Sequence, residues 1–116
     1  MATAFLFIGW NRPYPGQQKD AFNYLMREGA ERFQGWKKEG FFESSEMFGL
    51  TAHGGDLNGF VVLKGERAKL DELRRTDAFE KFSMTMSGLF DRYGVVPGVT
   101  EEGMKKVMDR NPEMGR

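Results

Sequence analysis

The chain contains no cysteine and a single histidine, His53. The absence of cysteine excludes disulfides, thiolate zinc ligands and cysteine nucleophiles. With only one histidine in addition, a zinc site of the usual protein-only kind lacks ligands. The glycine-rich motifs that cradle nucleotide phosphates are missing as well. We therefore expect no metal site and no bound cofactor.

An excess of basic residues is also lacking. Lys plus Arg and Asp plus Glu each number 17, so the formal net charge is zero. Nucleic-acid-binding proteins carry a basic surplus that neutralises phosphates, so nucleic acid is not an expected partner. No apolar run approaches the roughly 20 residues that span a bilayer, and no secretory signal pattern is present. These absences predict a cytoplasmic protein without membrane association.

Phenylalanine, in contrast, is abundant. The 116 residues include 11 Phe and 8 Met but only 3 Tyr. Because Phe has no polar group, these rings belong in a core or an interface. The length indicates one domain over residues 1–116, with a C-terminal tail from about residue 100 to 116. The amount of Phe indicates more buried surface than one small monomer requires.

Hydrophobic periodicity predicts four strands and two helical regions. Runs that are apolar at successive positions predict that the first and third strands are buried on both faces. Apolar residues three and four positions apart predict the helices. In chain order, the elements are a strand over residues 4–10, a helix over 17–38, a strand over 41–50, a strand over 59–64, a broken helical region over 68–93 and a strand over 95–99.

Three further features complete this α+β arrangement. Pro97 cannot donate to a hydrogen-bond ladder, so the last strand belongs at a sheet edge. Thr100 is suited to cap a short final helix that reaches Asp109. The dipeptide Asn58-Gly59 in the hairpin connection is suited to positive φ. Right-handed crossovers then give an antiparallel sheet with strands one and three in the middle and the helices on one face.

This βαββαβ order resembles the dimeric α/β-barrel superfamily, in which two ferredoxin-like subunits pack sheet to sheet. The resemblance extends from Ala4 to about Val99. It rests on the element order, the broken helical region 69–79 and the closing segment 93–98. It implies a homodimer. The apolar pattern of the strands also favours a homodimer, because the sheet face without helices needs a cover and a second copy supplies one.

The superfamily includes antibiotic-biosynthesis monooxygenases, haem-degrading enzymes, muconolactone isomerases and ligand-sensing regulator domains. Its haem-degrading members ligate iron through a histidine on the second long helix, and residues 79–93 contain none. Fold alone does not choose among the other activities. We expect a protein that binds a small hydrophobic or aromatic molecule in its barrel. The alternatives are a cofactor-independent monooxygenase or isomerase, and a non-catalytic assembly or regulatory module.

Trp10, Asn11, Arg12 and Tyr14 form the candidate ligand-binding group, at the end of the first strand. Cofactor-independent monooxygenases of this fold place similar residue types around a polycyclic phenol. The alternative is that these residues only form a strand-to-helix turn. If they do form a site, the aromatic walls and the fixed positive charge suit an anionic aromatic molecule.

His53, Glu46 and Glu43 are the candidate catalytic residues. His53 is followed by Asp56, with which it could form an acid–base pair, and it is expected at the same end of the sheet as Arg12. Its alternative role is that of a solvated hairpin tip. Glu43 and Glu46 have opposite parity on a regular strand, so one is expected to point into the barrel and act as a base. Their alternative is a pair of solvent-facing charges.

Overall fold

Four strands form one antiparallel sheet in the order β2-β3-β1-β4. The computed structural model describes residues 2–115, with side chains up to residue 113. Strands one and three are central and the strand with Pro97 lies at an edge, as the sequence predicts. The strands are β1 (Ala4–Trp10), β2 (Ser44–Gly49), β3 (Gly59–Gly65) and β4 (Gly94–Val99).

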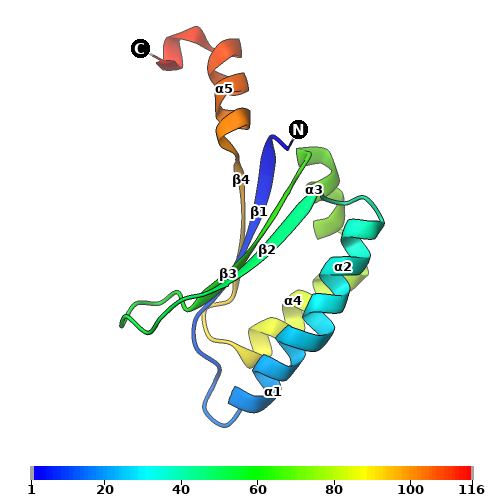
Figure 1. Ribbon diagram of the computed structural model, residues 1–116, viewed down its shortest axis with the longest axis vertical. Helices are drawn as coiled ribbons and strands as arrows, with labels where there is room; N and C mark the ends of the chain where they lie inside the picture. The colour runs from blue at the N-terminus through cyan, green and yellow to red at the C-terminus, as the bar shows by residue number, and fades with distance from the viewer. Residues whose placement is uncertain (1, 116) are drawn as a thin grey trace.

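Helices cover one face of this sheet and leave the other without a described helix (Figure 1). The first helical region is continuous, but its middle six residues have π-helical geometry. The final helix, α5, projects beyond the end of the sheet. The helices are α1 (Gln18–Asn23), η1 (Tyr24–Gly29), α2 (Ala30–Lys38), α3 (Arg67–Arg74), α4 (Asp77–Leu89), α5 (Glu101–Arg110) and η2 (Pro112–Gly115).

The core lies between the sheet and the helices. Leu6 and Ile8 on β1 alternate with residues of the other face and are fully buried. Phe82 on α4 is also fully buried, and its ring meets those of Phe33 and Trp36 edge-on at centroid distances of 5.4 and 5.8 Å. These edge-to-face pairs give the core its aromatic centre.

The second helical region ends earlier than its apolar pattern predicts. Helix α4 stops at Leu89, and Phe90 adopts an extended backbone. This turn sends the Phe90 ring into the core, with its centroid 5.7 Å from that of Trp10. Arg92 then takes a positive φ of 51° before β4 begins. Phe90, which continues the helical spacing after Leu89, is therefore buried from a turn and not from a helix.

The second strand is likewise shorter than predicted, because it begins at Ser44 and not at residue 41. Phe42 is buried just before it, where its backbone lies against Gly65 at the end of β3. A Cβ at Gly65 would approach the Phe42 Cα to 3.0 Å, so this crossing favours glycine.

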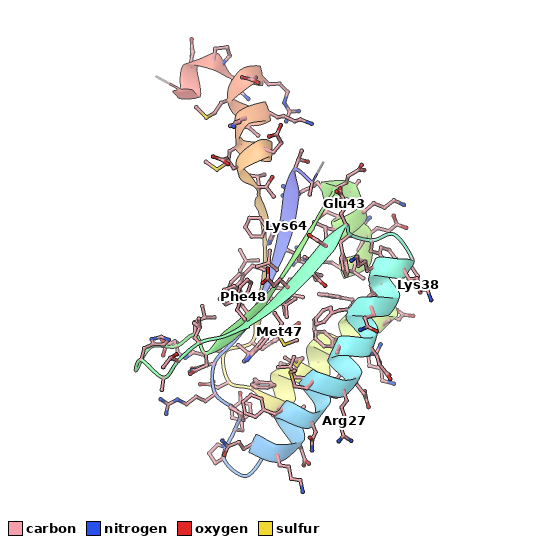
Figure 2. All side chains as sticks on the ribbon, in the orientation of Figure 1. Arg27, Lys38, Glu43, Met47, Phe48 and Lys64 are labelled. Carbon is pink, nitrogen blue, oxygen red and sulfur yellow. The ribbon has the colours of Figure 1, made fainter. Side chains whose placement is uncertain are left out.

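The face of the sheet that lacks helices carries its own apolar cluster. We call it the open face, and its central members are Phe7, Phe48, Phe60, Val62 and Val96. The Phe7 and Phe48 rings stack on either side of Phe60, at 5.0 and 4.9 Å. Figure 2 shows Phe48 on this side of β2 and Met47 on the helix side. Val96 is 56% exposed, so stacking alone does not cover the open face.

Tyr93 is the one described group with a clearly displaced pKa. Its burial raises the pKa of the phenol from 10.0 to about 12, and the hydrogen bond to Ser83 opposes this shift. The Ser83 Oγ and Tyr93 Oη atoms lie 2.8 Å apart. The folded state therefore favours the neutral phenol more than the unfolded chain does.

The central role of Phe82 gives a first prediction. Phe82→Ala should lower the free energy of unfolding by about 3–5 kcal/mol, because it opens a cavity among packed rings. Met84→Ala on the same helix is the matched control, since Met84 is 68% exposed, and its effect should stay within about 0.5 kcal/mol. Urea denaturation measures both. A loss below about 1 kcal/mol for Phe82→Ala would contradict the packing described.

Tyr93 gives a second prediction, on pH dependence. A pKa that is higher in the folded state stabilises the protein fully below the unfolded value and loses this effect as pH rises through the folded value. The free energy of unfolding should therefore fall between pH 10 and about 12. Tyr93→Phe should remove this part of the fall. Denaturant titrations at several pH values measure the free energy of unfolding of both proteins. If it falls equally with pH in wild type and in Tyr93→Phe, the assignment to Tyr93 is refuted.

Candidate functional site

A cavity of about 510 Å³ lies at the end of the sheet where β1 stops and the β2–β3 connection begins. We call it the rim cavity. All four residues of the predicted ligand-binding group line it, together with Phe22 of α1 and Asn58, which immediately precedes β3. The structure thus places the segment after β1, the first helix and the hairpin connection around one space. The residues that line it are Trp10, Asn11, Arg12, Pro13, Tyr14, Pro15, Gly16, Gln18, Phe22, Gly49, Leu50, Ala52 and Asn58.

Three aromatic side chains form the apolar walls of the rim cavity. Trp10 is 4% exposed, whereas Tyr14 and Phe22 are exposed toward solvent. Phe22 meets Phe90 edge-on at 5.8 Å, so Trp10 and Phe22 are both supported from behind by Phe90. Buried support of this kind fixes the orientation of the walls before any ligand arrives.

Gly59 allows the position of Trp10. A Cβ at Gly59 would come within 2.7 Å of the Trp10 indole, closer than side chains tolerate. The sequence suggested a positive φ for Asn58-Gly59, and this prediction is wrong, because neither residue has one. The positive φ in this connection belongs to Gly54, at 81°. Gly59 is required for close approach to a ring and not for turn geometry.

Asn58 fixes the wall contributed by the hairpin connection. Its side-chain amide donates to the Asn11 side-chain oxygen. Its backbone N–H donates to the Trp10 carbonyl at 2.9 Å, and its own carbonyl accepts from Leu50 N–H at 2.8 Å. The amide pairing leaves the Asn11 NH₂ group as a donor with capacity for a further partner. Sequence reasoning identified Asn58 only as a turn residue.

Arg12 supplies the positive charge of the site. Its side chain is exposed and makes no ion pair with any residue that the structure describes. The described lining of the rim cavity includes no carboxylate, lysine or histidine. The site therefore combines aromatic surface, amide groups and one positive charge.

His53 lies in the hairpin connection but outside the lining of the rim cavity. Its Nδ1 accepts from Gly55 N–H at 3.2 Å, and its Nε2 lies 2.7 Å from the Leu57 carbonyl oxygen. Asp56 instead pairs with Arg92, with Oδ2 and Nη1 3.2 Å apart. Both ring nitrogens of His53 thus contact backbone atoms of the hairpin connection.

Glu43 and Glu46 do not share a regular strand, because β2 begins at Ser44, and the parity argument therefore does not apply to Glu43. Glu46 pairs with Val62 in the register and borders a hollow of about 300 Å³ on the open face, with Ser44 and Lys64. Glu43 precedes β2, and its backbone N–H donates to the Lys64 carbonyl at 2.7 Å. Figure 2 shows Glu43 at the end of the sheet and Lys64 farther along it. Both carboxylates are exposed in the single chain.

The described residues form neither a metal-ligand cluster nor a membrane-spanning helix. No group of three or more His, Cys, Asp or Glu side chains is arranged to hold a metal ion among them. None of the helices within residues 2–115 is long and apolar enough to cross a membrane.

The role of Asn58 gives a prediction for the site. Asn58→Ala should lower the free energy of unfolding by about 1–2 kcal/mol, because the Asn11 side-chain oxygen loses its donor in a part-buried position. Asn23→Ala is the control, since Asn23 is exposed on α1. Urea denaturation compares the two. Equal effects would mean that the amide pair does not stabilise the hairpin connection.

Comparisons with known proteins support the α+β fold and give no information on activity. No family model matches the sequence, and no curated protein does. Among solved structures, the chain is similar to a crystal structure of a conserved protein from Methanosarcina mazei Go1. The TM-score is 0.51 and the identity 13%, over 83% of this chain and 91% of the other. At this identity the likeness concerns the α+β fold alone.

Proposed function

We propose that the protein is a ferredoxin-like, homodimeric α/β-barrel protein that binds a small aromatic anion in the rim cavity. The strand order β2-β3-β1-β4, with antiparallel pairing throughout, supports the topology. The open face supports the dimer, because its stacked Phe rings and exposed Val96 have no described cover within the chain. A second copy placed on this face buries both sheets at once.

The observation that carries the ligand proposal is the gathering of Trp10, Asn11, Arg12 and Tyr14 around one cavity. Planar walls favour a ring, because offset and edge-on aromatic contacts stabilise it. The unpaired guanidinium of Arg12 favours a carboxylate or phenolate, which it can bind with two hydrogen bonds. The volume of about 510 Å³ is in the range of small-molecule sites. A non-catalytic module without a ligand leaves this cavity unexplained.

A binding role is favoured over isomerase activity. Isomerisation of an unsaturated acid requires a base that removes a proton, usually His, Glu, Asp or Lys. None of these lines the described cavity. The second candidate is a cofactor-independent monooxygenase, which the same observation favours, since Asn, Trp, Tyr and Arg are the residue types that such enzymes use. Oxygen consumption with a polycyclic phenol separates this activity from simple binding.

The ligand proposal is tested with benzoate, hydroxybenzoates and naphthoates in thermal-shift and calorimetric titrations. At least one of these acids should bind, and Arg12→Ala should weaken that binding about tenfold or more, because a charge-assisted hydrogen bond is lost. The corresponding carboxamide should bind both proteins equally. Arg27→Ala is the control, since Figure 2 shows Arg27 on the helical layer, away from the sheet. If the acids bind wild type and Arg12→Ala alike, the rim cavity is not their site.

The dimer is tested by light scattering at micromolar concentration. Wild type should give about twice the chain mass of 13.3 kDa. Val96→Asp should give the monomer mass while keeping a cooperative melt, because it places an unpaired charge in the interface and leaves the core untouched. Met84→Asp, exposed on α4, should remain dimeric. A monomeric wild type would refute this part of the proposal.

A further inference from the structure

Asn11 and Asn58 form an amide pair in the wall of the rim cavity. Both side chains are half-buried, and both line the cavity. The Asn58 amide donates to the Asn11 side-chain oxygen. Within residues 2–115 neither side chain makes a second hydrogen bond, so the return bond that would close an amide dimer is not formed. The pair therefore keeps hydrogen-bonding capacity that the described protein groups do not use.

This remaining capacity consists of a donor and an acceptor together. The Asn11 NH₂ group is the donor, and the Asn58 side-chain oxygen is the acceptor. Reversing the direction of the bond between the two amides exchanges these roles and leaves the same set. A ligand group that satisfies both must itself donate and accept. A group that does only one leaves a part-buried polar atom without a partner, which weakens binding.

A hydroxyl group meets this requirement through a single oxygen atom, which donates one hydrogen bond and accepts others. A phenolic hydroxyl has a pKa of about 10, so it keeps its proton at neutral pH. A carboxylate is ionised at neutral pH and only accepts. The carboxylate therefore suits the Arg12 guanidinium, and the hydroxyl suits the amide pair.

The aromatic wall, the amide pair and the positive charge lie within the span of one substituted ring. Trp10, Asn11 and Arg12 follow one another in the chain and all line the cavity, and consecutive Cα atoms are only about 3.8 Å apart. We propose that the rim cavity selects aromatic acids that carry a ring hydroxyl, which binds Asn11 and Asn58 while the carboxylate binds Arg12. This inference rests on the proposed function and names the class of its aromatic anion.

The test compares three matched ligands by calorimetric titration of the full chain at neutral pH. They are benzoate or naphthoate, its ring-hydroxy isomers, and the methyl ethers of those isomers. At least one hydroxy acid should bind about tenfold more tightly than the unsubstituted acid, because it gains two hydrogen bonds. Its methyl ether should lose most of this gain, because an ether oxygen accepts but does not donate.

Variants assign the gain to the amide pair. In Asn11→Ala, the hydroxy acid should exceed the unsubstituted acid by about twofold or less, because one of its two partners is missing. In Arg12→Ala both acids should weaken, and the ratio between them should persist. Asn23→Ala, exposed on α1, is the control and should keep the wild-type ratio. Each ratio compares two ligands on the same protein, so a change in stability does not imitate the effect.

The outcomes separate this inference from the ligand proposal on which it rests. If the acids bind through Arg12 but a ring hydroxyl gives no gain, hydroxyl selection is overturned and the anion site stands. A gain that the methyl ether keeps in full, or that survives Asn11→Ala, also overturns the role of the amide pair. If none of the acids binds to wild type, both proposals are overturned.

Discussion

The rest of the structure depends on one constraint: the two central strands are apolar on both faces, and the helices within residues 2–115 cover one of these faces. On β1, Leu6 and Ile8 alternate with Phe5 and Phe7. The first pair lies under the helices and is fully buried, while the second pair lies on the open face and is half-buried. Alternation along a strand makes this division unavoidable.

The rim cavity follows from how the chain leaves the central strands. After β1, the backbone of Asn11 and Arg12 exchanges hydrogen bonds of 2.9 and 2.8 Å with Asp91, and Tyr14 N–H donates to the Leu89 carbonyl at 3.0 Å. These bonds hold the segment after β1 against the turn after α4. On the other side of the cavity, Asn58 attaches the hairpin connection to Asn11 and Trp10 through hydrogen bonds. Backbone and amide contacts thus keep the cavity walls in place, which suits a preformed binding site.

The sequence was sufficient for the existence and order of the four strands and for the part of the cavity lining that follows β1, because both depend on local patterns. The apolar run from Ala4 to Trp10 became β1 with these bounds, and the polar and aromatic residues after it line one cavity. What the sequence missed depends on tertiary contact. Asn58 and Gly59 matter through Asn11 and Trp10, which are more than forty residues away in the chain. No local periodicity encodes such a pair.

The same limit explains the end of α4 and the role of His53. The apolar spacing continues past Leu89, but Phe90 leaves the helix because its ring packs between Trp10 and Phe22. His53 has a catalytic side chain, yet its ring atoms are engaged with Gly55 and Leu57. Residue type and spacing indicate what a group is able to do, and its neighbours in space decide whether it is free to do it.

The central claim is that a second copy covers the open face, and distance measurement between spin labels tests it most directly. The chain has no cysteine, so Glu46→Cys gives a single label at the open face and Glu80→Cys a single label on the exposed side of α4. Packed sheets lie about 10 Å apart. Double electron–electron resonance should therefore find a short distance between Glu46→Cys labels of the two copies and a much longer one between Glu80→Cys labels. No dipolar coupling at Glu46→Cys, or a shorter distance at Glu80→Cys, would contradict the account.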